Sequence, residues 1–213
     1  MTLFAFLAKH RAEVATLFGE HLWLVGISML FAIAIGVPLG IVVARRPRWR
    51  TLILGGTSVI QTVPSLAMLG LLMPVPWLGF RADRLTIFAL TLYALLPIVR
   101  NTYTGMAGVD APVLQAAVGM GLTPGQLLWR VELPLAIPVI LAGIRVATAL
   151  TIGVATIAAA IGAGGLGEFI FRGLAMVDNT VILAGALPAA LMALAADGIL
   201  AGLQRVLHRR GHA

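Results

Sequence analysis

The chain has few residues of the types that carry out covalent chemistry. It contains no cysteine, which excludes thiolate catalysis, disulfides and zinc–thiolate sites. Its histidines lie near the termini or at the edges of apolar stretches, so no nucleophile–base pair or metal-ligand set is expected within those stretches: His10, His21, His208 and His212. The sequence also lacks the Gly-x-x-x-x-Gly-Lys-Ser/Thr loop that binds ATP phosphates. We therefore predict a non-catalytic chain that binds no cofactor and no metal of its own.

Polar residues beside two prolines are the next candidates. Pro64 and Pro97 lie inside apolar stretches, where each removes a helical hydrogen bond and predicts a kink. The neighbouring polar side chains either face a translocation pathway or satisfy the carbonyl groups that the prolines free, and the sequence leaves both roles open. We take as candidate pathway residues Gln61, Thr62, Pro64, Ser65, Pro97 and Asn101.

The glycine-rich run 162–167 has neither the lysine nor the preceding strand of a phosphate-binding loop. We predict a flexible turn there, leading into a short, partly inserted helix over 168–174. Gly164, Gly165 and Glu168 are its candidate gate residues. Asp197 is an acid at membrane depth, and we expect it to extend toward the membrane interface near Arg205 rather than to take part in transport.

Composition defines the elements that must hold these residues. Hydrophobic residues make up 60% of the 213 residues and charged residues 11%, with a mean hydropathy of +1.02. Long apolar stretches without a helical stripe indicate that lipid is the solvent. The sequence pI of about 11.5 comes from arginines just beyond the ends of these stretches. Such residues mark the cytoplasmic side of a membrane protein, so nucleic-acid binding is not expected.

A membrane-crossing helix needs roughly 20 apolar residues. We predict an all-α membrane protein with five such spans, and we place its N-terminus outside and its C-terminus in the cytoplasm because the arginines favour one side. Residues 1–21 are expected to lie on the external membrane surface, residues 22–204 to form the transmembrane domain, and residues 205–213 to form a cytoplasmic tail. The spans are 22–44, 52–73, 85–99, 137–161 and 180–203.

The loop between spans three and four, residues 101–136, is the least membrane-like stretch. Asp110 is expected to cap a helix that Gly119 or Gly121 ends in the left-handed conformation. Thr123 and Gln126 have the spacing of a capping box for a second short helix, and Pro134 is expected to redirect the chain into span four. Local chemistry alone favours an ordinary capped loop over a surface made for a partner.

A longer pattern changes that interpretation. Gln115-Ala116-Ala117, then three residues, Gly121, nine residues and Val131-Glu132-Leu133-Pro134 resemble the E-A-A–x3–G–x9–I-x-L-P signature of permease subunits in binding-protein-dependent ABC importers. Glutamine replaces the usual glutamate, and valine replaces isoleucine. The resemblance implies the type I importer fold and a coupling helix that docks on a cytoplasmic ATPase. It assigns to that contact Gln115, Ala116, Ala117, Gly119, Gly121, Thr123, Gln126 and Pro134.

Three further segments, 60–67, 93–102 and 161–170, resemble the osmoprotectant branch of these permeases, which imports glycine betaine, choline or carnitine. That resemblance implies a bacterial inner-membrane subunit that pairs with a second, identical permease. Its other partners would be an external solute-binding protein and an ATPase dimer that binds Mg-ATP. The alternatives are a permease for another small solute and an ion-coupled secondary transporter. The latter predicts internal repeats and intramembrane acids, but the sequence has no clear repeat and Asp197 is its single acid at membrane depth.

Overall fold

The apolar stretches fold into helices because the membrane interior offers no hydrogen-bond partner to an exposed backbone. The computed structural model describes residues 2–210, with side chains through residue 207, and contains no strand in that range. Met1 and residues 211–213, the outer ends of the predicted external segment and cytoplasmic tail, lie outside the described residues. Within the described residues, four helices are long and apolar enough to cross a membrane: α2 (Arg11–Arg45), α6 (Ala82–Ala107), α9 (Leu133–Ala158) and α11 (Asn179–Arg210).

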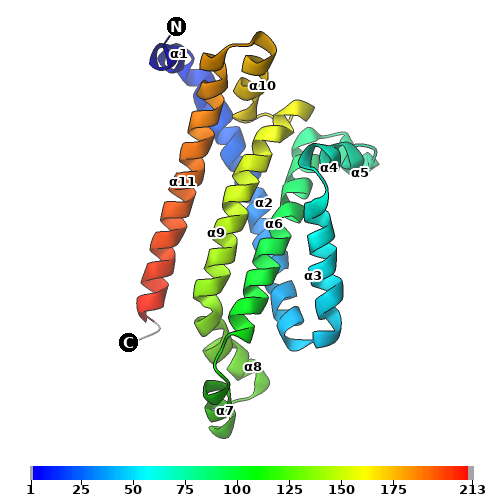
Figure 1. Ribbon diagram of the computed structural model, residues 1–213, viewed down its shortest axis with the longest axis vertical. Helices are drawn as coiled ribbons and strands as arrows, with labels where there is room; N and C mark the ends of the chain where they lie inside the picture. Colours follow the sequence, from blue (N-terminus) through cyan, green and yellow to red (C-terminus); the bar gives the residue numbers. More distant parts are fainter. Residues whose placement is uncertain (1, 211–213) are drawn as a thin grey trace.

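Two further helices, α3 (Pro47–Thr62) and α4 (Ser65–Leu72), are bent by 101° relative to one another, and the pair gives a fifth span when it is counted as one. The all-α fold with about five spans is thus confirmed, and the kink predicted at Pro64 is a complete break. Figure 1 shows α4 and α5 (Pro76–Gly79) running across the bundle, whereas α3 runs along it. The span predicted over 52–73 with a kink at Pro64 is therefore divided into two helices, because Val63 and Pro64 adopt extended backbone angles.

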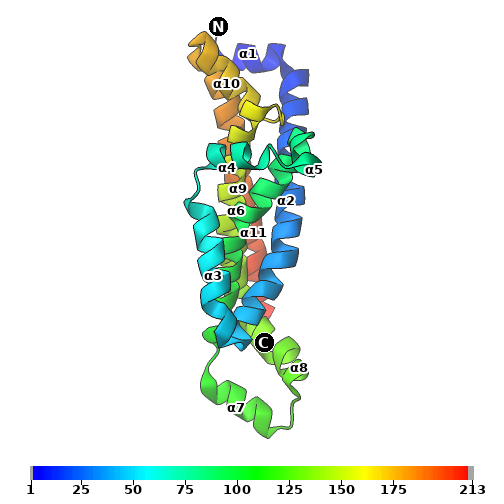
Figure 2. The same ribbon diagram turned by 90° about the vertical axis from the view of Figure 1, so that its right-hand side faces the viewer.

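Short helices cover both ends of the bundle. α1 (Leu3–Lys9) and α10 (Gly167–Met176) lie at one end, and α7 (Ala111–Gly119) and α8 (Pro124–Leu127) project from the other, as Figures 1 and 2 show. A π-helical turn, η1 (Leu128–Glu132), joins α8 to α9, and a 3-10 turn, η2 (Ala159–Ile161), ends α9. Residues 108–132, within the predicted loop 101–136, therefore form a separate knob beyond α6 and α9.

The helix that contains the first predicted span extends beyond it on the N-terminal side. α2 starts at Arg11 rather than near residue 22, because Leu17 and His21 are buried on the same helix as the later apolar residues. The residues before it form α1, which is attached to the bundle by aromatic contacts of Phe6. The Phe6 ring stacks on His10 with centroids 4.2 Å apart and meets the edge of Phe169 in α10 at 5.9 Å.

α6 is the central helix of the bundle, and it packs against α2 on one side and α9 on another. Glycines permit the close approach: Gly36 of α2 faces Ile98, and Gly143 of α9 faces Asn101 and Pro97. A Cβ atom added at Gly143 would lie 2.5 Å from Asn101 Cβ and 2.7 Å from the Pro97 carbonyl oxygen. Close packing through small residues is the usual way in which membrane helices associate.

This packing predicts opposite effects for one methyl group at two glycines of α9. Gly143→Ala should destabilise the chain by about 1–3 kcal/mol because the new Cβ meets α6. Gly153→Ala, at a position with nothing within 4 Å, should instead stabilise it by about 0.5–1 kcal/mol through helix propensity. Thermal unfolding of both variants in one detergent measures the difference, and a Gly143→Ala variant as stable as Gly153→Ala would contradict this packing.

Candidate functional site

The projecting loop is ordered by standard helix-terminating interactions. Gly121 has φ +83°, and it ends α7 with hydrogen bonds from Gly121 N–H to Val118 O at 2.9 Å and from Leu122 N–H to Ala117 O at 3.2 Å. These are the two bonds of a Schellman motif. Gly121 is thus the left-handed glycine, and Gly119 is the last residue of the helix. Asp110 occupies the N-cap position but makes no side-chain bond to the helix, so its predicted capping was wrong.

The predicted capping box is present at α8. Thr123 Oγ1 accepts from Gln126 N–H at 3.4 Å, and Gln126 Oε1 accepts from Thr123 N–H at 2.9 Å. Pro134 does not redirect the chain, because it lies in the first turn of α9 after the π-helical turn. The helical path therefore continues from Pro124 into the span.

Arg45, the last residue of α2, attaches this loop to the end of the first span. Its Nη1 and Nη2 each donate to Pro124 O at 3.3 Å, and Nη2 also pairs with the carboxylate of Glu132. The Glu132 side chain is only 14% exposed. Neither residue was among the predicted site residues. The sequence did contain a signal for this ion pair. The signature includes one acidic residue, and the arginines at 45–50 require an acidic partner.

The knob exposes apolar side chains at the end of the bundle. Ala117 is buried, whereas Gln115 and Ala116 are exposed beside it. Large apolar side chains surround them, and two are more than two-thirds exposed, Met120 at 75% and Trp129 at 71%. Apolar residues gathered on a projecting surface indicate a protein partner.

Four predicted pathway residues lie together. One cavity of about 320 Å³ lies where α3 ends, and it is lined by Gln61, Thr62, Pro64 and Ser65 together with Leu150 and Val154 of α9. A cavity of this size, lined by the amide of Gln61, the hydroxyl-bearing residues Thr62, Ser65 and Tyr93, and apolar side chains, is large enough for a small solute.

Gln61 and Tyr93 hold this break against α6. Pro97 has no N–H, so the carbonyl group of Tyr93, four residues earlier, lacks its helical donor. Gln61 Nε2 donates to that carbonyl at 2.8 Å, and the Tyr93 hydroxyl donates to Val63 O, which the break leaves without a helical donor. Gln61 thus fills both roles that the sequence left open, because it satisfies a freed carbonyl and also lines the cavity.

The remaining predicted residues lie elsewhere. Asn101 Nδ2 donates to Pro97 O at 2.8 Å, and both residues face α9 rather than the cavity. Gly164 and Gly165 have φ +81° and +82°, and the Gly165 N–H donates to Glu20 Oε2 of α2 at 3.0 Å. The turn predicted to be flexible is thus attached to α2. Glu168 lies in the first turn of α10.

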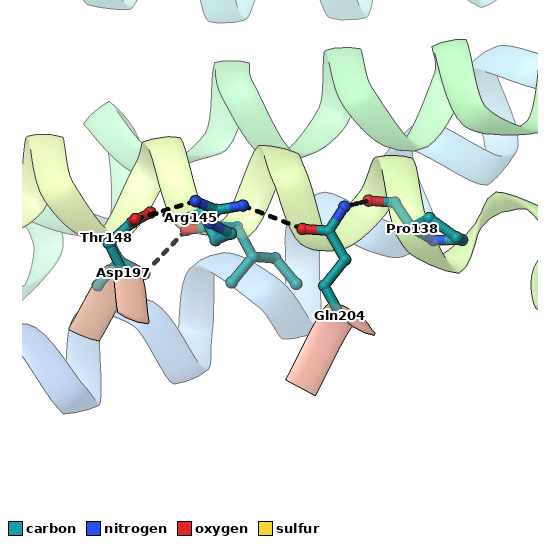
Figure 3. Close-up of polar contacts among 6 residues, drawn as sticks. Pro138, Arg145, Thr148, Asp197 and Gln204 are labelled. Atoms are coloured by element: carbon teal, nitrogen blue, oxygen red, sulfur yellow. Dashed lines mark hydrogen bonds and ion pairs between the residues drawn. The ribbon is translucent and has the colours of Figure 1, made fainter. Parts of the chain in front are cut away.

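Arg145 is a charged residue at membrane depth that sequence reasoning missed. Its Nε and Nη2 donate to Asp197 Oδ1 and Oδ2 at 2.8 and 2.9 Å, and its Nη1 donates to Gln204 at 3.1 Å, as Figure 3 shows. Asp197 therefore binds α9 instead of extending toward the interface as expected. The signal was available, since Arg145 is the one basic residue in the predicted span 137–161, and charges at this depth are normally paired.

A five-span helical bundle, a capped two-helix knob with an exposed apolar surface and a cavity at a broken span together define a membrane transport subunit that docks on another protein. Comparison with protein families agrees with this class. The chain belongs to the family of binding-protein-dependent transport system inner membrane components, whose model matches residues 36–211.

Curated relatives cover almost the whole chain. The choline transport system permease protein OpuBD of Bacillus subtilis is 44% identical over 96% of this chain and 90% of its own length. The glycine betaine/carnitine/choline transport system permease protein OpuCD of the same species is 46% identical over 89% of this chain and 82% of its own. The osmoprotectant import permease protein OsmW of Salmonella typhimurium is 41% identical, with 97% of both chains covered.

Solved structures support the fold. A chain of the MetNI methionine ABC transporter in an inward-facing conformation superposes with a TM-score of 0.83 at 21% identity, covering 93% of this chain and 98% of its own. An amino acid ABC transporter chain gives a TM-score of 0.77 at 18% identity, covering 95% and 97%. The type I importer permease fold that the signature implied is thereby confirmed.

The hydrogen bond from Gln61 to the carbonyl group of Tyr93 predicts a specific loss of stability. Gln61→Leu removes the donor to Tyr93 O and should destabilise the chain by about 1–3 kcal/mol, because a buried carbonyl loses its partner. Thr62→Val is the matched control, since Thr62 lines the same cavity but bonds only to Val59 O of its own helix. Thermal unfolding compares the two, and equal stability of both variants would exclude the bracing role of Gln61.

The contact of Arg45 with Glu132 predicts a charge-reversal rescue. Arg45→Glu should lower the thermal unfolding midpoint and expose the loop to proteolysis, because two carboxylates then face each other. The double variant Arg45→Glu, Glu132→Arg should recover most of the loss. Limited proteolysis within residues 108–132 measures the loop directly. A double variant cleaved as fast as Arg45→Glu would show that the pair does not hold the loop.

Proposed function

We propose that this chain is the transmembrane subunit of an ATP-driven importer for a quaternary-amine compatible solute such as glycine betaine, choline or carnitine. The single observation that carries the proposal is the projecting knob, in which the signature residues form an ordered, partly apolar surface at one end of five spans. The names of the relatives, all transport permeases for such solutes, support the choice of substrate class.

The knob would dock on a cytoplasmic ATPase dimer that binds and hydrolyses Mg-ATP. We assign that contact to the residues that the signature indicated, with the buried Ala117 supporting the surface from beneath: Gln115, Ala116, Ala117, Gly119, Gly121, Thr123, Gln126 and Pro134. We add Met120 and Trp129 because both are exposed beside them. The knob then lies in the cytoplasm of a bacterial cell and the N-terminus lies outside. Closure of the ATPases on ATP pushes the knob, and the helical continuity from Pro124 into α9 carries that motion into the membrane.

The solute would pass the cavity at the α3–α4 break. Gln61, Thr62, Pro64 and Ser65 line it, and Pro97 and Asn101 contribute indirectly by shaping α6 behind it. An external binding protein delivers the solute and supplies most of the affinity. Aromatic cages suit quaternary ammonium groups, and Tyr93 is the single aromatic residue among the described residues that line this cavity. Gly164, Gly165 and Glu168, at the end of the bundle opposite the knob, would form the external gate.

A second permease subunit would complete the pathway. We propose a second copy of this chain, in keeping with the sequence analysis. Two of the relatives bear on this point, since the permease proteins OpuCB and OpuCD of Bacillus subtilis carry the same glycine betaine/carnitine/choline system name. The functional experiment therefore has to distinguish a pair of identical subunits from a mixed pair.

Reconstitution tests these assignments together. Proteoliposomes that contain this chain, an ATPase subunit and a solute-binding protein from the same genome should accumulate labelled glycine betaine or choline only with ATP inside. Uptake by this chain alone, driven by an ion gradient without ATP, would establish the secondary-transporter alternative. Uptake that appears only after a different permease polypeptide is added would replace the identical pair with a mixed one.

Gly121→Asp is the variant that tests coupling. It places a charge on the knob at a left-handed glycine, and we expect ATP-driven uptake to fall at least tenfold while insertion and solute-independent ATPase activity persist. Gly121→Ala separates the charge from the backbone strain of about 1–2 kcal/mol that any side chain meets at φ +83°. Uptake by Gly121→Asp equal to that of the parent chain would remove Gly121 from the ATPase contact.

A further inference from the structure

The second cavity, between α9 and α11, has a charge and a shape that the importer function does not use. It measures about 390 Å³ and is lined by Pro138, Arg145, Ala201, Gln204 and Arg205. Arg145 and Arg205 carry two positive charges and Asp197 a single negative one, so the region has one positive charge in excess. Arg205 has no hydrogen bond or ion pair to another described residue.

The donors that line this cavity are held in place. A guanidinium has five N–H groups, and Arg145 uses three of them on Asp197 and Gln204, which leaves one on each terminal nitrogen. Gln204 is itself fixed, because its Nε2 donates to Pro138 O at 3.0 Å (Figure 3). A rigid pair of N–H groups beside an unpaired arginine matches the oxygens of a phosphate.

An apolar strip continues from the cavity toward the middle of the membrane. Leu187, Leu191 and Leu194 precede Arg205 at helical spacing on the same face of α11. All three are exposed, and Leu194 is exposed at 70%. A cationic cavity near the end of a span, followed by an exposed apolar strip directed into the bilayer, has the form of a site for a charged amphiphile.

We propose that this cavity binds the phosphate headgroup of an anionic phospholipid, with the acyl chains along Leu187, Leu191 and Leu194. Arg205 supplies the uncompensated charge, and Arg145, positioned by Asp197 and Gln204, supplies directed donors. The bound lipid would fill the seam between α9 and α11. Among the described residues, this seam is held by the Arg145–Asp197 ion pair and by the two hydrogen bonds of Gln204. This site does not depend on the solute or on the ATPase.

Native mass spectrometry of the full-length chain in detergent tests the site by titration with POPG and, separately, with POPC. The parent chain should prefer POPG, and Arg205→Gln should lower that preference about fivefold, the effect of removing one basic residue near a membrane surface. Arg205→Lys should keep most of the preference. Arg46→Gln, at an exposed arginine outside the cavity, is the matched control and should keep the parent preference.

Several results would overturn the proposal. One is an Arg205→Gln variant with the parent preference, and another is an Arg46→Gln variant that loses as much as Arg205→Gln, since the effect would then be general surface charge. Displacement of POPG by inorganic phosphate or by glycine betaine would assign the cavity to a free anion or to the solute. Loss of a dimer mass in Arg205→Gln would assign this face to a second copy of the chain. None of these results bears on ATP-driven uptake.

Discussion

The membrane interior supplies no hydrogen-bond partner, and this constraint explains the arrangement around the prolines. Pro97 leaves the carbonyl group of Tyr93 without a donor, and the break at Pro64 leaves that of Val63 without one. The chain satisfies both from side chains, with Gln61 donating to the first and the Tyr93 hydroxyl to the second. The carbonyl freed by each proline is thus satisfied by a side chain from the other span. The break in the second span is consequently a fixed feature that opens a cavity at one position.

The same constraint governs the charges. Arg145 and Asp197 lie on different helices within the membrane-spanning region, and each is accommodated because the other neutralises it. Gln204 and the carbonyl group of Pro138 extend the contact along the α9–α11 seam. Because α9 continues from the knob and α11 is attached to α9 at these points, the two helices are expected to move as one body when the knob is displaced.

Much of the fold could be predicted from the sequence because it depends on local properties. Apolar length located the spans, and cap residues located the two helices of the knob, down to the capping box at Thr123 and Gln126. The errors arose where a tertiary contact decides the structure. Whether Pro64 kinks or breaks a helix depends on Gln61 and Tyr93, which lie far apart in sequence. The start of α2 at Arg11 likewise depends on packing that the apolar count does not detect.

The residues of the candidate site also fall into a group that the sequence identifies and a group that only the fold brings together. The knob residues follow one another in the chain, so their order and spacing identify them without a structure. The pathway residues come from separate helices, and only the fold shows that Gln61 and Ser65 share a cavity with Leu150 while Asn101 does not. Arg145 was missed for a related reason, because an arginine inside an apolar span acquires a meaning only with its partner. When one predicted span contains a single acid and another contains a single base, the two should be considered as a candidate ion pair. The reason is that an unpaired charge inside the membrane is costly.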